Sequence, residues 1–354
     1  MSRLRPTLQL LLLCSTLLLT ACAATPSAEP AIPTDISTAA DLDAFAVNAA
    51  LGRGVNLGNA LEANYEGEWG MTLDAAYFRL LAEAGFTNVR IPIRWSAHAA
   101  TAAPYTIEAE FLARVDWAID QALANELRPI INMHHYDEIM QAPEAQQERF
   151  LAIWRQLAEH YQDQPPAVIF ELLNEPNSNM LPFRWNKLIP AALATIRESN
   201  PTRIVIIGPT GWNSATELTN LELPADDQQI IVTFHFYEPF QFTHQGAEWV
   251  NGADAWLGTT WDGTAPQQRQ IEMLFDKAAD WGAKHHRPIF MGEFGAYSKA
   301  DMASRAQWTA FVARAAEDRG FSWAYWEFGA GFGVYDRTTN SWQEPLLQAL
   351  LGQE

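Results

Sequence analysis

Two glutamates, each at the end of an apolar run, are the residues of this 354-residue chain best suited to chemistry. Glu175 follows the short, almost continuously apolar run 167–173, and Pro176 ends that run just beyond it. Such a run is typical of a parallel β-strand covered on both faces. Glu293 follows a second run, 288–291, and is flanked by glycines that let other groups approach closely. We therefore expect both carboxyl groups at strand ends, brought together only by the fold.

Two such carboxyl groups can hydrolyse a glycosidic bond if one is held protonated and the other ionised. We assign the proton donor to Glu175, because burial and a nearby negative charge should raise its pKa. Glu293 would attack the anomeric carbon, and water would then release the glycosyl-enzyme with Glu175 acting as base. Arg90 and Tyr237 are expected beside Glu293, where they would lower its pKa. The two carboxyl groups are expected about 5 to 5.5 Å apart, the spacing of retaining enzymes.

Two further residue types support this assignment. Asn174, next to Glu175, would hydrogen-bond the sugar 2-hydroxyl, a contact that strengthens in the transition state. Trp326 offers a flat apolar face for a pyranose ring. Each residue alone has an ordinary explanation, since a buried Arg is often ion-paired, here to Glu171, and a Trp on the last strand is often core. Together at one rim they indicate a site.

Two other classes of function are alternatives to a glycosidase. His134, His135 and Asp137 at a strand end would suit a metal-dependent hydrolase. Adjacent residues of a strand point to opposite faces, so the two histidines would not readily share an ion, and we expect neither a metal nor another cofactor. A non-catalytic carbohydrate-binding barrel is the third class. It is disfavoured because a binder has no need of two carboxylates with matched surroundings.

The elements that must position these residues alternate along the chain from about residue 41 onward. The runs predicted as strands are 53–57, 88–93, 128–133, 167–173, 203–207, 230–236, 288–291 and 322–325. The predicted helices are 73–84, 109–125, 145–161, 183–199, 267–284 and 303–319, with 214–221 the weakest. This order predicts an α/β fold, a (β/α)8 TIM barrel over residues 41–354 as a single catalytic domain, with a doubly wound open sheet as the alternative.

Polar and aromatic residues gather where the predicted strands stop, and in a TIM barrel those ends share one face. These residues are Asn56, Asn59, Arg94, Trp95, His134, His135, Asn174, Glu175, Trp212, His235, Tyr237, Glu293 and Trp326. The longest connection, 238–266, has no clear secondary structure in the sequence and carries His244, Trp249, Trp256 and Trp261. A loop of this length in a compact domain is usually functional, so we expect one wall of a groove, with Trp256 and Trp261 merely packing it down.

The composition of the chain narrows the range of possible ligands. A content of 48% hydrophobic and 18% charged residues allows a large core. The net charge of −19 argues against nucleic acid or anionic lipid as a ligand and favours a neutral polymer such as a polysaccharide.

Both cysteines, Cys14 and Cys22, fall in the leader, so we expect no disulfide and no Cys metal site in the folded part. We expect a monomer.

The first 40 residues predict export. A basic start precedes the apolar run 8–20, which has signal-peptide length and is too short for a transmembrane helix. Leu19-Thr20-Ala21-Cys22 resembles the lipobox of bacterial lipoproteins, so we expect a signal peptide 1–21, a lipid on Cys22 as the only membrane contact, and a Pro/Ala-rich spacer 22–40. Alternatively, Ala21-Cys22-Ala23 fits an ordinary signal-peptidase site that would release a soluble secreted or periplasmic protein.

The assembled motifs closely resemble those of glycoside hydrolase family 5, retaining barrel hydrolases that include many cellulases and mannanases. The resemblance spans residues 51–351. The motifs are Gly54-Val55-Asn56-Leu57-Gly58-Asn59-Ala60-Leu61-Glu62, Val89-Arg90-Ile91-Pro92, Asn132-Met133-His134-His135, Leu173-Asn174-Glu175-Pro176, His235-Phe236-Tyr237, Gly292-Glu293-Phe294-Gly295 and Tyr325-Trp326-Glu327-Phe328.

The resemblance implies Glu175 as acid/base and Glu293 as nucleophile of an endo-β-1,4-glucanase. The family's other active-site positions match Arg90, His134, Asn174, His235, Tyr237 and Trp326. The opening motif and the segment 242–249 resemble a branch whose endoglucanases also cleave mannan, in which sugar subsites would be lined by Asn59, Glu62, His135, Trp212, His244 and Trp249. The choice among cellulose, mannan, xyloglucan and mixed-linkage glucan stays open, because glucose and mannose differ only at C2.

Overall fold

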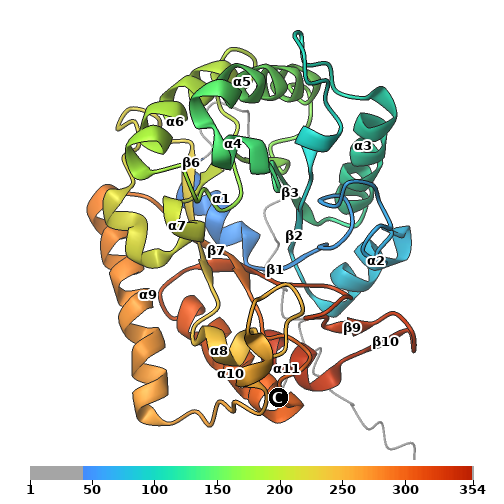
Figure 1. Cartoon of the computed structure of the whole chain (residues 1–354), viewed down its shortest axis with the longest axis vertical. Helices are drawn as coiled ribbons and strands as arrows, with labels where there is room; N and C mark the ends of the chain where they lie inside the picture. Colours follow the sequence, from blue (N-terminus) through green and yellow to red (C-terminus); the bar gives the residue numbers. More distant parts are fainter. Residues whose placement is uncertain (1–42, 353–354) are drawn as a thin grey trace, which may run out of the picture. The chain divides into compact units, whose positions relative to one another are not determined.

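A closed barrel of eight parallel strands organises residues 43–352, the part of the chain that the computed structural model describes (Figure 1). Its strands are β1 (Arg53–Asn56), β2 (Asn88–Ile91), β3 (Arg128–Asn132), β4 (Ile169–Glu171), β5 (Val205–Ile207), β6 (Ile230–Phe236), β7 (Ile289–Phe294) and β8 (Ser322–Tyr325). Each strand pairs with the next, and β8 pairs with β1. The predicted TIM barrel is confirmed, and the open-sheet alternative is wrong.

Helices surround the barrel in Figure 1. They are α1 (Ala44–Leu51), α2 (Ala75–Ala84), α3 (Ala109–Ala124), α4 (Asp137–Gln141), α5 (Pro143–His160), α6 (Pro182–Arg197), α7 (Thr210–Asn213), α8 (Phe240–Thr243), α9 (Ala265–His285), α10 (Met302–Glu317) and α11 (Glu344–Leu351). Short 3-10 helices are η1 (Trp95–Ala97), η2 (Ala215–Asn220) and η3 (Ala253–Trp256), and a small hairpin joins β9 (Tyr335–Asp336) to β10 (Ser341–Trp342). None of the helices in the described range is long and apolar enough to span a bilayer.

The interior of the barrel changes from apolar to polar along the strands, and this change positions the site. Side chains at alternate positions of a strand share a face. Ile130 of β3 and Ile169 of β4 belong to an apolar cluster that also includes Leu51 of α1. Two residues further along the same strands, Asn132 and Glu171 are fully buried polar groups. The carboxyl ends of the strands therefore carry the polar layer that the active site needs.

The six clearest predicted helices are present with ends within two residues of those expected. The weakest, 214–221, is the 3-10 helix η2. The long connection 238–266 is not irregular throughout, because it contains α8 and η3. The predicted signal peptide, Cys22 and spacer lie outside the described residues.

Candidate active site

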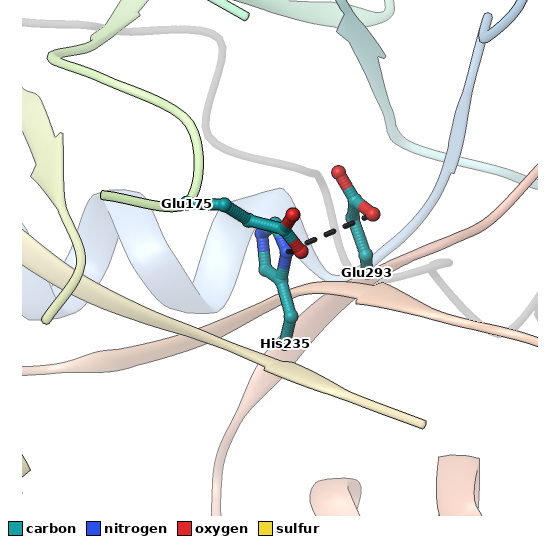
Figure 2. A group of neighbouring side chains, drawn as sticks. All are labelled: Glu175, His235 and Glu293. Carbon is teal, nitrogen blue, oxygen red and sulfur yellow. Dashed lines mark hydrogen bonds and ion pairs between the residues drawn. The ribbon is translucent and has the colours of Figure 1, made fainter. Parts of the chain in front are cut away.

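The carboxyl groups of Glu175 and Glu293 point toward one another beside the His235 ring (Figure 2). His235 Nδ1 lies 2.8 Å from Glu175 Oε1 and 3.6 Å from Glu293 Oε2. One oxygen of each carboxyl group and a nitrogen of the ring all lie within 4.8 Å of one another. This closeness fits the separation of about 5 to 5.5 Å found in retaining glycosidases better than the 6.5–9.5 Å of inverting ones.

The Arg90 side chain, at the end of β2, organises the polar layer beneath this pair. Its Nε and Nη2 donate to the two oxygens of Glu171 at 2.6 and 2.7 Å. Nη1 donates to Glu293 Oε1 at 2.7 Å and to Asn56 Oδ1 at 2.8 Å, and Nη2 also donates to Asn174 Oδ1 at 2.7 Å. All five N–H donors of a guanidinium are thereby used. Arg90 contacts Glu293, as predicted, and it also forms the ion pair with Glu171 that was its ordinary explanation.

Glu293 lies in β7 with both of its oxygens held by donors. Oε1 accepts from Arg90, and Oε2 accepts from the Tyr237 hydroxyl at 2.8 Å. Burial raises the pKa of Glu293 above its ordinary value, while His235, Arg90 and Tyr237 act in the opposite direction. The expected lowering of this pKa is therefore wrong, because desolvation of the carboxylate outweighs its partners. The donors still fix the orientation of the ionised group.

Glu175 lies just beyond β4 with a left-handed backbone conformation, φ +46°. Its side chain is 25% exposed, whereas that of Glu293 is 6% exposed. Burial raises the pKa of Glu175 to about 7, with Glu171 as the nearby negative charge that adds to the rise and Arg90 opposing it. A carboxyl group with this pKa and access to solvent can exchange a proton near neutral pH.

The other residues expected to support the pair lie around it. Asn174 is buried against Arg90, and His134 stacks on Trp326 with ring centroids 5.7 Å apart. Burial lowers the pKa of His134 well below its usual value, so its ring is neutral. Trp95, expected at the rim, is instead fully buried, and its indole N–H donates to the Asn132 carbonyl.

A cleft of about 1410 Å³ opens above the carboxyl pair. Its lining includes all six residues expected at sugar subsites, Asn59, Glu62, His135, Trp212, His244 and Trp249. Trp212 and Trp249 are each 60% exposed, so they present free indole faces. Three residues that were not predicted from the sequence also line the cleft, namely Trp69, Tyr297 and Phe332. Trp69 lies after β1 in a loop rich in aromatic residues and glycine. This composition could have indicated a sugar-binding loop from the sequence.

Glu62 lines the cleft but is nearly fully buried. Its carboxyl oxygens accept the backbone N–H groups of Asn59 and Ala60. Burial raises the pKa of Glu62 to about 8. Glu62 therefore holds the loop that carries Asn59, which has a left-handed φ of +64°.

The connection between β6 and α9 forms one side of the cleft, as expected. The Trp249 ring meets the Tyr297 ring edge-on at 4.9 Å, and the Tyr297 hydroxyl donates to Glu248 at 2.6 Å. The His244 ring stacks on Phe240 at 4.1 Å. Trp261 is buried, as expected for a residue that packs the loop down.

Glu175, His235 and Glu293 are donor types that metals use, and among residues 43–352 they form the one group close enough to share an ion. The group already has a cation, because the Arg90 guanidinium contacts Glu293, and Tyr237 holds the other oxygen. Both oxygens of Glu293 are therefore engaged by hydrogen-bond donors of the protein itself.

The residues of the metal-hydrolase alternative do not converge. The His134 and His135 rings are nearly perpendicular, and His134 Nδ1 contacts the Asn132 amide at 3.0 Å. Asp137 is mostly exposed and pairs with Arg94 at 2.9 Å.

Comparisons with known proteins agree with this geometry. A family model described as Cellulase (glycosyl hydrolase family 5) matches residues 52–331. Endoglucanase H of Acetivibrio thermocellus is 38% identical over 316 residues, which cover 87% of this chain and 34% of the relative. Cellulase/esterase CelE of the same organism is 30% identical over 330 residues, 84% of this chain and 39% of the relative. The chain thus spans little more than a third of the length of these two relatives.

Solved structures are similar over their whole length. Endoglucanase Cel5A from the hyperthermophilic Thermotoga maritima is 49% identical with a TM-score of 0.86, covering 88% of this chain and 100% of that one. Structures of Thermotoga maritima Cel5A in complex with mannotriose and with cellobiose are each 48% identical, also with TM-scores of 0.86, and cover 87% of this chain and 100% of theirs.

Proposed function

The chain belongs to the cellulase family, glycosyl hydrolase family 5, and we propose that it hydrolyses internal β-1,4 linkages of glucan chains with retention of anomeric configuration. The observation that carries this proposal is the close pair Glu175 and Glu293, two carboxyl groups with different surroundings at the open end of the barrel. One is partly exposed with a near-neutral pKa, and the other is fixed by Arg90 and Tyr237.

In the first step the Glu293 carboxylate attacks the anomeric carbon, while Glu175 gives its proton to the glycosidic oxygen and the bond to the leaving sugar breaks. Arg90 and Tyr237 keep the attacking carboxylate ionised and oriented. Ester formation removes the negative charge of Glu293, which favours the ionised form of Glu175. Glu175 then takes a proton from the incoming water, and Glu293 leaves as the carboxylate.

We propose cellulose-type glucan as the main substrate and mannan or glucomannan as additional ones. The cleft supports this through indole faces at Trp69, Trp212, Trp249 and Trp326, which suit the apolar faces of several successive pyranose rings. The similarity to an enzyme solved with both cellobiose and mannotriose supports the wider range.

The test is hydrolysis of carboxymethylcellulose, glucomannan, mannan, xyloglucan and mixed-linkage glucan, with Glu293→Gln as the inactive control. Endo cleavage should lower the viscosity of carboxymethylcellulose long before many reducing ends appear. Loss of viscosity only in proportion to reducing ends would contradict endo action, and activity on none of the five would contradict the proposed substrate class.

We further propose that the protein is an exported, monomeric lipoprotein anchored through Cys22. The support is the sequence Leu19-Thr20-Ala21-Cys22 after an apolar run of signal-peptide length. Mass spectrometry of the mature N-terminus should find a diacylglycerol-modified Cys22. An unmodified chain that starts at Ala24 would support the soluble alternative instead.

A further inference from the structure

Both ring nitrogens of His235 face defined partners, one in the carboxyl pair and one behind it. Nδ1 lies against Glu175 Oε1 at 2.8 Å. On the opposite side, Nε2 lies 3.3 Å from the side-chain nitrogen of Asn213. Asn213 is fully buried, and its Oδ1 has no hydrogen-bond partner among the described residues.

We propose that Asn213 is a positioning residue that fixes the tautomer of His235 and thereby decides which oxygen of Glu175 carries the catalytic proton. This inference rests on the proposed acid/base role of Glu175. The sequence motifs did not point to Asn213, which follows the exposed Trp212.

The charges around His235 select one tautomer. Oxygens of both Glu175 and Glu293 face Nδ1. Whenever Glu175 is ionised it only accepts hydrogen bonds, so Nδ1 then carries a proton, and the Asn213 donor favours the same tautomer when Glu175 is protonated. Burial lowers the pKa of His235 to about 4, although Glu293 and Glu171 act in the opposite direction, so the ring is neutral near pH 7. In a neutral ring with a proton on Nδ1, Nε2 is an acceptor. The amide N–H of Asn213 is the donor that this acceptor meets.

The backbone around Asn213 takes up strain to deliver this amide. Gly211, Trp212 and Asn213 have successive left-handed φ values of 67°, 59° and 55°. Residues other than glycine rarely adopt this conformation, although Asn tolerates it better than most. The turn directs Trp212 into the cleft and Asn213 into the barrel.

Two glycines clear the space for this contact. A Cβ on Gly208 would lie 2.2 Å from Asn213 Oδ1, and a Cβ on Gly292 would lie 3.0 Å from His235 Nε2. The turn is also tied to the acid itself, because the Trp212 N–H donates to the carbonyl of Pro176, next to Glu175. The turn, the imidazole and the acid are thus one connected unit.

The tautomer determines where the acidic proton sits. With a proton on Nδ1, His235 donates to Glu175 Oε1, so the proton of the neutral acid is carried on Oε2 and is available to the leaving oxygen. With the proton on Nε2 instead, the Nδ1 lone pair would accept the Glu175 proton at Oε1 and hold it away from the glycosidic oxygen. After proton transfer, the Nδ1–H bond stabilises the carboxylate that forms.

The experiment compares Asn213→Asp, Asn213→Gly and the control Asn200→Asp with the parent protein. An ionised aspartate at position 213 accepts instead of donating, which draws a proton onto Nε2. Glycine removes the donor while suiting the left-handed backbone. Asn200 is also buried, and its side-chain amide donates to the Ala158 carbonyl. It contacts Arg203 and does not line the cleft, so Asn200→Asp reports the general effect of a buried Asn→Asp change.

The direct readout is 15N NMR of protein labelled in its histidines, with the His235 signals assigned by their loss in His235→Gln. The parent should show a protonated Nδ1 and an unprotonated Nε2. Asn213→Asp should show a proton on Nε2, Asn213→Gly should show a mixture of the two forms, and Asn200→Asp should match the parent. This readout does not depend on glycosidase activity, so it fails or succeeds separately from the proposed function.

The kinetic readout is kcat/KM on a cello-oligosaccharide and on an aryl glycoside whose leaving group needs no proton. Asn213→Asp should lower the first by about 10- to 100-fold, part of the roughly 10²–10⁴-fold that general acid catalysis contributes, and change the second much less. A proton on Nε2 in the parent, an unchanged tautomer in both Asn213 variants, or an equal loss on the two substrates would each overturn the proposal. A shifted tautomer with unchanged kcat/KM on the oligosaccharide would also overturn it.

Discussion

Replacing Arg90 by lysine tests whether one buried guanidinium holds the active site together. Arg90 is fully buried and donates five hydrogen bonds, to Glu171, Asn174, Asn56 and Glu293. A lysine ammonium has three donors and cannot copy the planar fork. At least two of the five bonds are therefore lost.

The magnitude follows from the groups left behind. Hydrogen bonds to charged groups contribute about 1.5–3 kcal/mol each, and breaking a buried ion pair costs about 3–5 kcal/mol. We expect Arg90→Lys to lower the free energy of unfolding by about 3–5 kcal/mol. Because most domains have about 5–15 kcal/mol in total, the variant should still fold but with a clearly lower denaturation midpoint.

The assay is guanidinium denaturation followed by tryptophan fluorescence. The matched control is Arg79→Lys, since Arg79 is 59% exposed and pairs with Glu83 at 3.3 Å on the surface of α2. That change should stay within about 0.5 kcal/mol of the parent. A loss below about 1 kcal/mol for Arg90→Lys, or a loss equal to that of the control, would refute the view that the buried network depends on the fork geometry.

The remaining predictions concern activity. Glu293→Gln should abolish turnover of every substrate, whereas Glu175→Gln should keep activity on aryl glycosides whose leaving group needs no proton; the reverse pattern in steady-state kinetics would exchange the two roles. The pH profile of kcat/KM should be bell-shaped: activity falls as pH rises through about 7, where Glu175 loses its proton, and falls on the acid side where Glu293 becomes protonated, at a pH above the ordinary glutamate pKa because burial raises it. A profile that is flat from pH 5 to pH 9 would contradict this assignment. Activity should survive dialysis against EDTA, and a loss that Zn²⁺ or Mg²⁺ restores would favour the metal alternative.

Much of the fold followed from the sequence, because alternating apolar runs and amphipathic stretches specify the barrel directly. Placing residues at the ends of the predicted strands was enough to group Arg90, Glu175, His235 and Glu293 on one face of the barrel. Elements that do not repeat this pattern were missed, including α1 across one end of the barrel and the small hairpin of β9 and β10.

What the sequence could not give were quantities that depend on three-dimensional surroundings. The pKa of Glu293 is raised, whereas a lowered pKa was expected, because desolvation outweighs its hydrogen-bond partners. The partners of a group can be inferred from a sequence, but the extent of its burial cannot. Glu62 was expected to line a subsite and also supports a loop, since its backbone partners lie in its own segment. The contact of Asn213 with His235 could not be predicted, because it depends on three successive residues with left-handed backbone conformation.

The central claim is that Glu293 forms a covalent bond to the sugar while Glu175 serves first as acid and then as base. The most direct test is 1H NMR of the anomeric protons of products released from a cello-oligosaccharide during the first minutes of reaction. Double displacement predicts that the new reducing ends appear first as β-anomers and only later equilibrate. Initial release of α-anomers would mean single displacement by water and would contradict the account.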